Sequence, residues 1–149
     1  MAAPAGDHLM TLSVADRLDI LDVVGRADAA ASRRDADAYV DLFTEDAVLD
    51  GSQGRHAGSA ALRSSVGPIW ASEGPASLHL TLNPILDSGD GPDEAIVSSV
   101  LLIIAPEAPI TIRAAAVITQ TLRRTGDTWR ISRRTVASAE PGQAMNPGG

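Results

Sequence analysis

The sequence predicts an α+β domain in which helices come first and a mainly antiparallel sheet follows. Apolar residues recur at helical spacing up to about residue 70, whereas apolar and polar residues alternate with the period of a β-strand from about residue 77. The chain has 149 residues, a length that suits a single domain with one hydrophobic core.

The first helix is expected over residues 14–33. Ser13 stands immediately before this segment and Asp16 follows three residues later, which is a helix N-cap signal. At about 100° per residue the segment has one broad apolar side, but Arg17, Asp28 and Ser32 fall inside it. Because a carboxylate is costly to bury without a partner, we expect an arginine or a histidine beside Asp28.

Turn residues divide the rest of the chain into shorter elements. We expect a second helix over 35–43, a strand over 46–50, a turn and loop over 51–58, and a third helix over 59–70. The alternating segments predict strands over 77–87, 94–104, 110–124 and 128–137. The small, Gly/Pro-rich ends, 1–12 and 139–149, are expected to be loose tails, which leaves a domain over 13–138.

Composition argues against several classes of function. The net charge of −7 is the opposite of the basic footprint that nucleic-acid binding needs. The lack of cysteine excludes disulfides, thiolate catalysis and cysteine metal sites, and the three histidines show no metal-ligand spacing. No apolar run is long enough to cross a bilayer, and the N-terminus lacks the features of a secretion signal. We therefore expect no nucleic-acid or membrane partner, and a cytoplasmic location.

The stretch SLHLTLNPI (77–85) has two different faces. Three leucines alternate with a polar row that includes His79, Thr81 and Asn83. An imidazole is a natural base for removing a proton from an apolar substrate, because it titrates near neutral pH. In the alternative interpretation the polar row faces water, or His79 makes a single structural hydrogen bond.

Several stretches occur in a suggestive order and spacing. They are the first helix, DADAYVDLFTEDAVLD (35–50), the loop with Gly54 and Gly58, the His79-x-x-x-Asn83-Pro84 strand, and LRRTGDTWRISRRTV (122–136). Together they resemble the SnoaL-like group of the NTF2-like superfamily. The resemblance implies a cone in which about three N-terminal helices pack on a strongly curved, mainly antiparallel sheet around an apolar pocket. Relatives include polyketide cyclases, ketosteroid isomerases, dehydratases and members that only bind ligands or partners.

The resemblance also suggests site residues. The dehydratase and dehydrochlorinase branch uses a His–Asp pair, and its histidine matches His79. Its aspartate falls on Ser32, so Asp28, one helical turn earlier on the same side, is the carboxylate that would replace it. The tyrosine of the branch falls on about Val24, and the usual arginine, five residues after the tryptophan, matches Arg134.

This chain departs from the family pattern on the strand over 110–124. Where relatives often have Gly-x-Tyr-x-Asp, it has Ala116, Ile118 and Gln120. Arg134 is uncertain in orientation, because simple alternation puts Arg133 on the face of Trp129 and only a bulge would bring Arg134 inward. Asp28 also has a structural alternative, an ion pair with Arg17 or Arg134.

The expected pocket is mostly aliphatic, with a few polar groups at one end. Its expected lining is Leu21, Val24, Trp70, Leu82, Ile118 and Ile131, with Ser32 and Asn83 as polar contacts. The ligand would be a small apolar polyketide-, terpenoid- or steroid-like molecule, and no cofactor or metal is expected.

Two hypotheses about function remain open. In the first, the chain is a cofactor-independent lyase, isomerase or cyclase. His79 is then the general base, Asp28 or Ser32 orients it, and Arg134 or Asn83 stabilises developing negative charge. In the second, it is a non-catalytic module that binds a small ligand or another protein. In both cases we expect a homodimer through the outer face of the sheet, because residues 101–104 are apolar on both faces.

Overall fold

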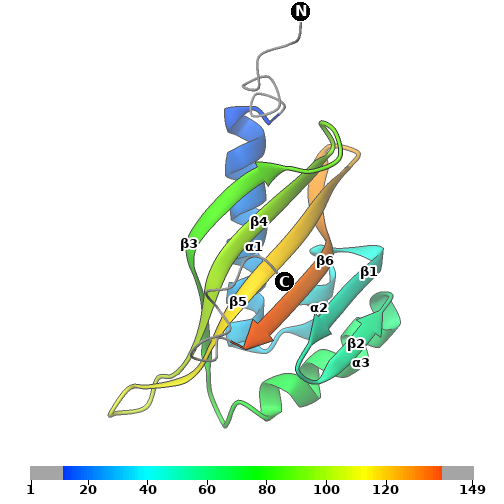
Figure 1. The fold of residues 1–149 in the computed structure, drawn as a ribbon. Coiled ribbons are helices and arrows are strands. Elements are labelled where there is room, and N and C mark those ends of the chain that lie inside the picture. Colours follow the sequence, from blue (N-terminus) through cyan, green and yellow to red (C-terminus); the bar gives the residue numbers. More distant parts are fainter. Residues whose placement is uncertain (1–11, 139–149) are drawn as a thin grey trace, which may run out of the picture.

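The computed structural model describes residues 12–138, which form three helices and six strands (Figure 1). The elements are α1 (Val14–Arg33), α2 (Ala36–Val40), β1 (Phe43–Gly51), β2 (Gly54–Ala57), α3 (Ser59–Ala71), β3 (Leu78–Ser88), β4 (Glu94–Ala105), β5 (Thr111–Thr125) and β6 (Thr128–Ser138). The predicted architecture of about three helices on a curved, mainly antiparallel sheet is confirmed.

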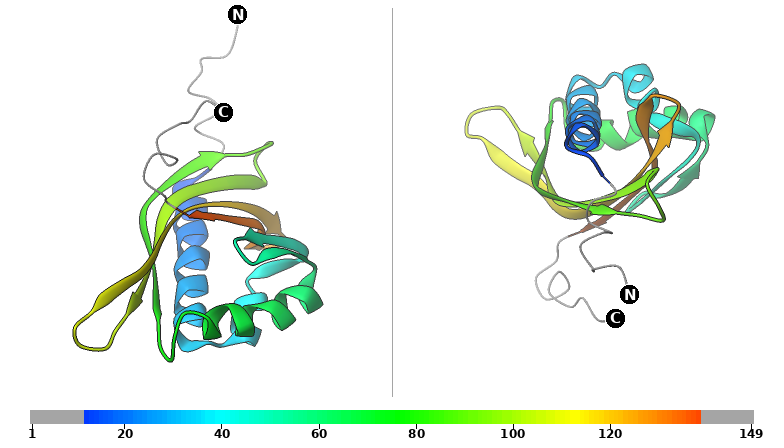
Figure 2. Two further views of the ribbon diagram at one scale, coloured as in Figure 1. Left: turned by 60° about the horizontal axis from the view of Figure 1, so that its bottom comes forward. Right: turned by 90° about the horizontal axis from the view of Figure 1, so that it is seen from above.

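The six strands form one sheet in the order β2-β1-β6-β5-β4-β3. Neighbouring strands are antiparallel except for β1 and β6, which run parallel. The long strands curl, and α1 lies along the concave face that they make (Figure 2). Because β3 is at the edge of the sheet, one side of its backbone has no strand to bond to.

Helix α1 has the bounds that its sequence predicts. The backbone N–H of Asp16 donates to Ser13 Oγ at 3.0 Å, and the N–H of Ser13 donates to a carboxylate oxygen of Asp16 at 3.3 Å. This reciprocal capping box satisfies two N–H groups at the start of the helix. The helix ends at Arg34, whose φ of 58° is in the left-handed region that stops helices.

Three segments differ from the prediction. Helix α2 ends at Val40 rather than at Phe43, because the carbonyl of Leu42 already accepts the N–H of Ile131 as β1 pairs with β6. The expected loop over 51–58 contains strand β2, which folds back on β1. Leu12, assigned to the N-terminal tail, is buried in the core, and the rest of both predicted tails lies outside the described residues.

The main core lies between α1 and one end of the sheet, where Ile20, Val24, Leu122 and Ile131 are at most 2% exposed. The outer face of the sheet carries exposed apolar side chains instead. They include Leu78, Leu80, Leu82, Ile85 and Val117. Homodimerisation through this face stays a prediction.

In residues 12–138 no helix is both long and apolar enough to span a bilayer.

Candidate functional site

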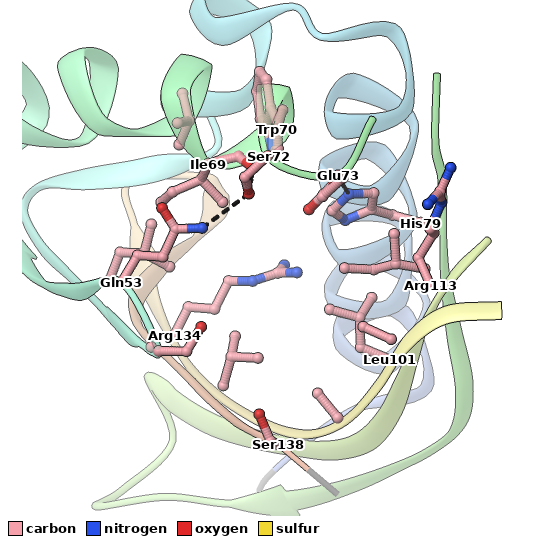
Figure 3. A pocket seen from close by; sticks show the side chains of 18 of the residues that line it. Gln53, Ile69, Trp70, Ser72, Glu73, His79, Leu101, Arg113, Arg134 and Ser138 are labelled. Carbon is pink, nitrogen blue, oxygen red and sulfur yellow. Dashed lines mark hydrogen bonds and ion pairs between the residues drawn. The ribbon is translucent and has the colours of Figure 1, made fainter. Parts of the chain in front are cut away.

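A cavity of about 460 Å³ lies at the end of the concave face that α3 closes. Such a volume is typical of small-molecule sites. Its walls come from α2, from β1 and β2, from α3 with the loop that follows it, and from the inner face of β3–β6 (Figure 3). The apolar part of the lining includes Leu49, Val66, Ile69, Trp70, Leu101, Ile103 and Val136.

Small side chains on β5 make room for the cavity. Residues 114–116 are three consecutive alanines, and all three line it. Further along the same strand the inward positions are Ile118, Gln120 and Leu122, all fully buried. The change from alanine to larger residues along one strand separates the hollow end of the sheet from the filled end.

Of the predicted apolar lining, Trp70 borders the cavity and the other five residues do not. Val24, Ile118 and Ile131 lie in packed protein, and they and Leu21 are outside the cavity lining. Leu82 points the other way, to the outer face, where it is 37% exposed. Val24, Ile118 and Ile131 do face inward, but the sequence did not indicate at which end of α1 the space lies.

His79 faces inward, and its partner is Glu73. Nε2 of the imidazole lies 2.7 Å from Oε1 of Glu73, and the side chains are only 5% and 12% exposed. The hydroxyl of Ser77 donates to the same Oε1 at 2.8 Å. Both His79 and Glu73 line the cavity, so a titratable pair forms part of its wall.

Within this pair the carboxylate is the group that the cavity reaches. The hydrogen bonds described for Glu73 both end on Oε1, and Figure 3 shows the carboxylate group of Glu73 turned towards the cavity. The imidazole of His79 has Nε2 against Glu73, while its Nδ1 is buried without a partner among the described residues. A ligand would therefore meet Glu73 first, with His79 behind it.

Asp28 and Ser32 do not orient the imidazole, as the sequence had suggested. Oδ2 of Asp28 accepts the backbone N–H of Thr81 at 2.8 Å, and Oγ of Ser32 accepts that of His79 at 2.9 Å. Because β3 is an edge strand, these N–H groups have no neighbouring strand to bond to. Asp28 and Ser32 thus attach α1 to the sheet edge, and neither lines the cavity.

Asn83 was expected to join the polar row that faces the pocket, but it is exposed and outside the lining. The pairing of β3 with β4 shifts register between Leu82 and Ile85, and Asn83 adopts a φ of 53° at this point. The residue that follows is Pro84, which cannot donate to a sheet and is tolerated here on an edge strand. The irregularity ends the alternation that the sequence had shown.

The bulge that Arg134 requires is present in β6. Leu122 pairs with Ile131 and Thr121 pairs with Arg133, so Ser132 is the extra residue. Arg134 is consequently inward and 3% exposed, and its guanidinium projects into the cavity in Figure 3. Arg133 points outward, with its guanidinium 3.5 Å from a carboxylate oxygen of Asp50.

The cavity holds polar groups that the sequence interpretation had not selected. Tyr39 is 3% exposed, stacks edge-on against Trp70 and has Arg134 over its ring at 5.9 Å. Burial raises the pKa of the Tyr39 phenol, and this outweighs the opposite effect of Arg134. His56, in the segment expected to be a turn and loop, is on β2 and lines the cavity.

Only weak signals in the sequence pointed to these residues. Tyr39 is the single tyrosine of the chain and stands at helical spacing in DADAYVDLF. Glu73 lies two residues after the end of α3 and gives no periodic signal. Within residues 12–138, no three His, Asp or Glu side chains are grouped closely enough to hold a metal ion.

The chain belongs to the SnoaL-like family, because the model of the SnoaL-like domain matches residues 12–135. No curated protein matches it in sequence. Among solved structures, a Nostoc punctiforme protein of unknown function with a cystatin-like fold has a TM-score of 0.79 at 23% identity, with 88% of this chain and 96% of that one covered.

Two further structures with similar folds have the names of enzymes. A putative scytalone dehydratase from Novosphingobium aromaticivorans has a TM-score of 0.72 at 18% identity, with 85% of this chain and 86% of that one covered. The hexachlorocyclohexane dehydrochlorinase LinA-type3 from Novosphingobium barchaimii has a TM-score of 0.74 at 17% identity, with 85% and 88% covered. At these identities the likeness shows a shared fold.

Proposed function

We propose that this protein is a cofactor-independent enzyme of the lyase or isomerase type that removes a proton from a small, mainly apolar molecule. The observation that carries the proposal is the Glu73–His79 pair, joined at 2.7 Å in the wall of a cavity that also receives Arg134. Polyketide-, terpenoid- and steroid-like compounds are the substrate classes that suit the family and the largely apolar walls.

In this mechanism Glu73 is the general base and His79 is a positioning residue. With its proton on Nε2, the imidazole donates to Oε1 and holds the carboxylate in place, so that Oε2 accepts a proton from a C–H group of the substrate. The electron pair moves onto a neighbouring carbonyl or expels a leaving group. The first outcome gives an isomerase or cyclase and the second gives a lyase.

Arg134 and Tyr39 are suited to stabilise the negative charge that this step creates. The guanidinium of Arg134 is buried, and a buried guanidinium interacts strongly with a developing oxyanion. The raised pKa of Tyr39 keeps its hydroxyl protonated, and therefore able to donate a hydrogen bond. The names of the dehydratase and dehydrochlorinase neighbours, which refer to loss of water and of hydrogen chloride, support elimination chemistry for this fold.

The second candidate is a non-catalytic module that binds a small molecule. One observation favours it. Neither ring nitrogen of His79 is accessible to a ligand, because Nε2 is bonded to Glu73 and Nδ1 is buried. A binding module needs the cavity and Arg134 but does not need a base. Binding of a ligand without turnover by the wild-type protein would favour this candidate.

The test compares Glu73→Gln with wild type on epoxides, hydroxysteroids and polyketide intermediates. For any compound that the wild type converts, we expect a loss of about 10²–10⁴-fold in kcat, because the variant has no base. Glu45→Gln is the matched control, since Glu45 is exposed and outside the cavity lining. If Glu73→Gln turned over substrate as fast as wild type, with unchanged unfolding in urea, Glu73 would not be the catalytic base.

His79→Ala separates positioning from direct catalysis. We expect a smaller loss in kcat than for Glu73→Gln, together with a displaced pH profile, because the carboxylate loses its fixed hydrogen-bond donor. A loss as large as that of Glu73→Gln, with an unchanged pH profile for the remaining activity, would contradict the assigned order of the two residues.

A further inference from the structure

We propose that the ligand of this cavity is a small monocarboxylate, an apolar molecule whose single anionic group binds Arg134. The proposal deepens the proposed function and rests on it for the identity of the site. It concerns binding, however, and can be tested without turnover.

The first observation is a buried cation without a counter-ion. Arg134 is 3% exposed, and none of the ion pairs described within residues 12–138 includes it. Its described partners are neutral, since Nη1 donates to Oε1 of Gln120 at 3.3 Å and the guanidinium lies over the ring of Tyr39. An isolated charge is costly to bury, so an anionic ligand here would replace a missing partner.

Neither Glu73 nor Asp28 forms an ion pair with Arg134 among those described within residues 12–138. Oε1 of Glu73 is bonded to Ser77 and His79. Oδ2 of Asp28 accepts from the backbone of β3. Burial raises the pKa of Tyr39, so its phenol stays neutral and cannot serve as the counter-ion.

The second observation is the sign of the charge in the cavity. The whole chain has a net charge of −7, yet the lining contains two arginines, Arg113 and Arg134, against a single carboxylate, Glu73. Arg113 is exposed, and its guanidinium lies beside Gly74, directly after Glu73. Arg134 therefore supplies a buried anion contact and Arg113 a solvent-exposed one, an arrangement that attracts anions into a cleft of an otherwise acidic protein.

The third observation concerns the polarity and size of the part of the ligand that lies beyond its carboxylate. Beyond the polar groups named above, the inner walls are alanine, leucine, isoleucine, valine and tryptophan side chains, and the remaining polar lining residues are Ser52, Gln53, His56, Ser72 and Ser138. The apolar part of the wall suits a hydrocarbon or aromatic body. The cavity volume of about 460 Å³ keeps the body small.

The experiment uses acids and their uncharged amides as matched probes. Benzoate, cyclohexanecarboxylate and 2-naphthoate are titrated into the full-length protein by calorimetry at neutral pH and low salt, each beside its primary amide. We expect at least one acid to bind about tenfold or more tightly than its amide, because charge-assisted hydrogen bonds to a buried guanidinium are strong. If no acid in the set binds more tightly than its amide, the proposal is overturned.

Arg134→Gln should abolish the preference for the acid while leaving the affinity for the amide nearly unchanged. Arg133→Gln is the matched control, because it removes the same charge from the next residue on the outer face. If Arg134→Gln fails to fold, Arg134→Lys keeps the charge and should retain a reduced preference for the acid. An equal loss of preference in Arg133→Gln would mean that net charge, rather than Arg134, selects the anion, and would overturn the assignment.

Failure of this proposal can be distinguished from failure of the proposed function. If the protein prefers acids but Glu73→Gln leaves turnover unchanged, the anion site is supported and the catalytic role of Glu73 is wrong. Turnover that depends on Glu73, with acids and amides bound equally, would overturn the anion site alone.

Discussion

The two ends of the concave face differ in how the same strands are used. At one end Leu122 on β5 and Ile131 on β6 pack against Ile20 and Val24 of α1, and none of the four is more than 2% exposed. At the other end the same two strands present residues 114–116, all alanine, and Arg134, and a cavity remains. The filled end supplies packing energy, whereas the hollow end leaves polar groups uncovered for a ligand.

The difference arises from side-chain size on β5 and from one extra residue on β6. The bulge at Ser132 lies between Ile131, which belongs to the filled end, and Arg134, which belongs to the hollow end. It allows an arginine to occupy an inward position that simple alternation would have given to Arg133. A sheet thus changes from core to binding site along its length without a change of fold.

The largest expected effect is a difference in stability between two leucines that become alanine. Leu122→Ala, at the filled end, should lower the free energy of unfolding by about 2–5 kcal/mol, because it creates a closed void. Leu101→Ala should cost less, roughly 2 kcal/mol, because its side chain already borders an open cavity. Equilibrium unfolding in urea measures both, and equal losses would mean that the two ends are packed alike.

The second expected effect is on ligand binding. Ala116→Leu adds side-chain volume where space exists, so it should weaken binding of the best monocarboxylate by about tenfold, with less than about 1 kcal/mol change in unfolding free energy. Ala95→Leu is the counterpart at a fully buried position outside the lining, and should destabilise by about 1–3 kcal/mol. If Ala116→Leu proved as destabilising as Ala95→Leu, the hollow end would have no free space to fill.

The smallest expected effect concerns Asp16, at the start of α1. Partial burial raises its pKa, but hydrogen bonds from Ser13, Trp129 and Arg124 lower it more, so the net pKa is below the ordinary value of 3.8. A lowered pKa in the folded state stabilises the protein above the unfolded pKa, and this contribution is lost as pH falls through the folded pKa. The effect belongs to the filled end, because Trp129 is part of the core.

Asp16→Asn should therefore cost about 1 kcal/mol at neutral pH, a typical value for a helix cap, and the difference from wild type should shrink below pH 3.8. Urea unfolding at a series of pH values measures it. Asp19→Asn, an exposed change one turn further along the helix, is the control. A difference that stays constant as the solution is acidified would show that the ionised carboxylate is not what stabilises the helix.

Local patterns were enough to predict much of the fold. The bounds of α1 followed from the Ser13 cap and an apolar periodicity, and period-two alternation located the four long strands to within a few residues. Both signals depend on near neighbours in the chain, so they can be recognised without the tertiary structure. Alternation also showed that His79 and the leucines lie on opposite faces of their strand, but it did not show which of the two faces looks inward.

The partners of these residues were decided only by the tertiary structure. Glu73 meets His79 because the loop after α3 returns to the sheet edge, and no periodicity marks a loop residue. Asp28 was identified correctly as an unusual residue, but its partner is a backbone N–H that is free only because β3 ends the sheet. The sequence by itself determined which helices and long strands form, since these depend on local backbone geometry. The site needed the packed chain, because contacts between distant segments depend on strand order, bulges and the space that small side chains leave.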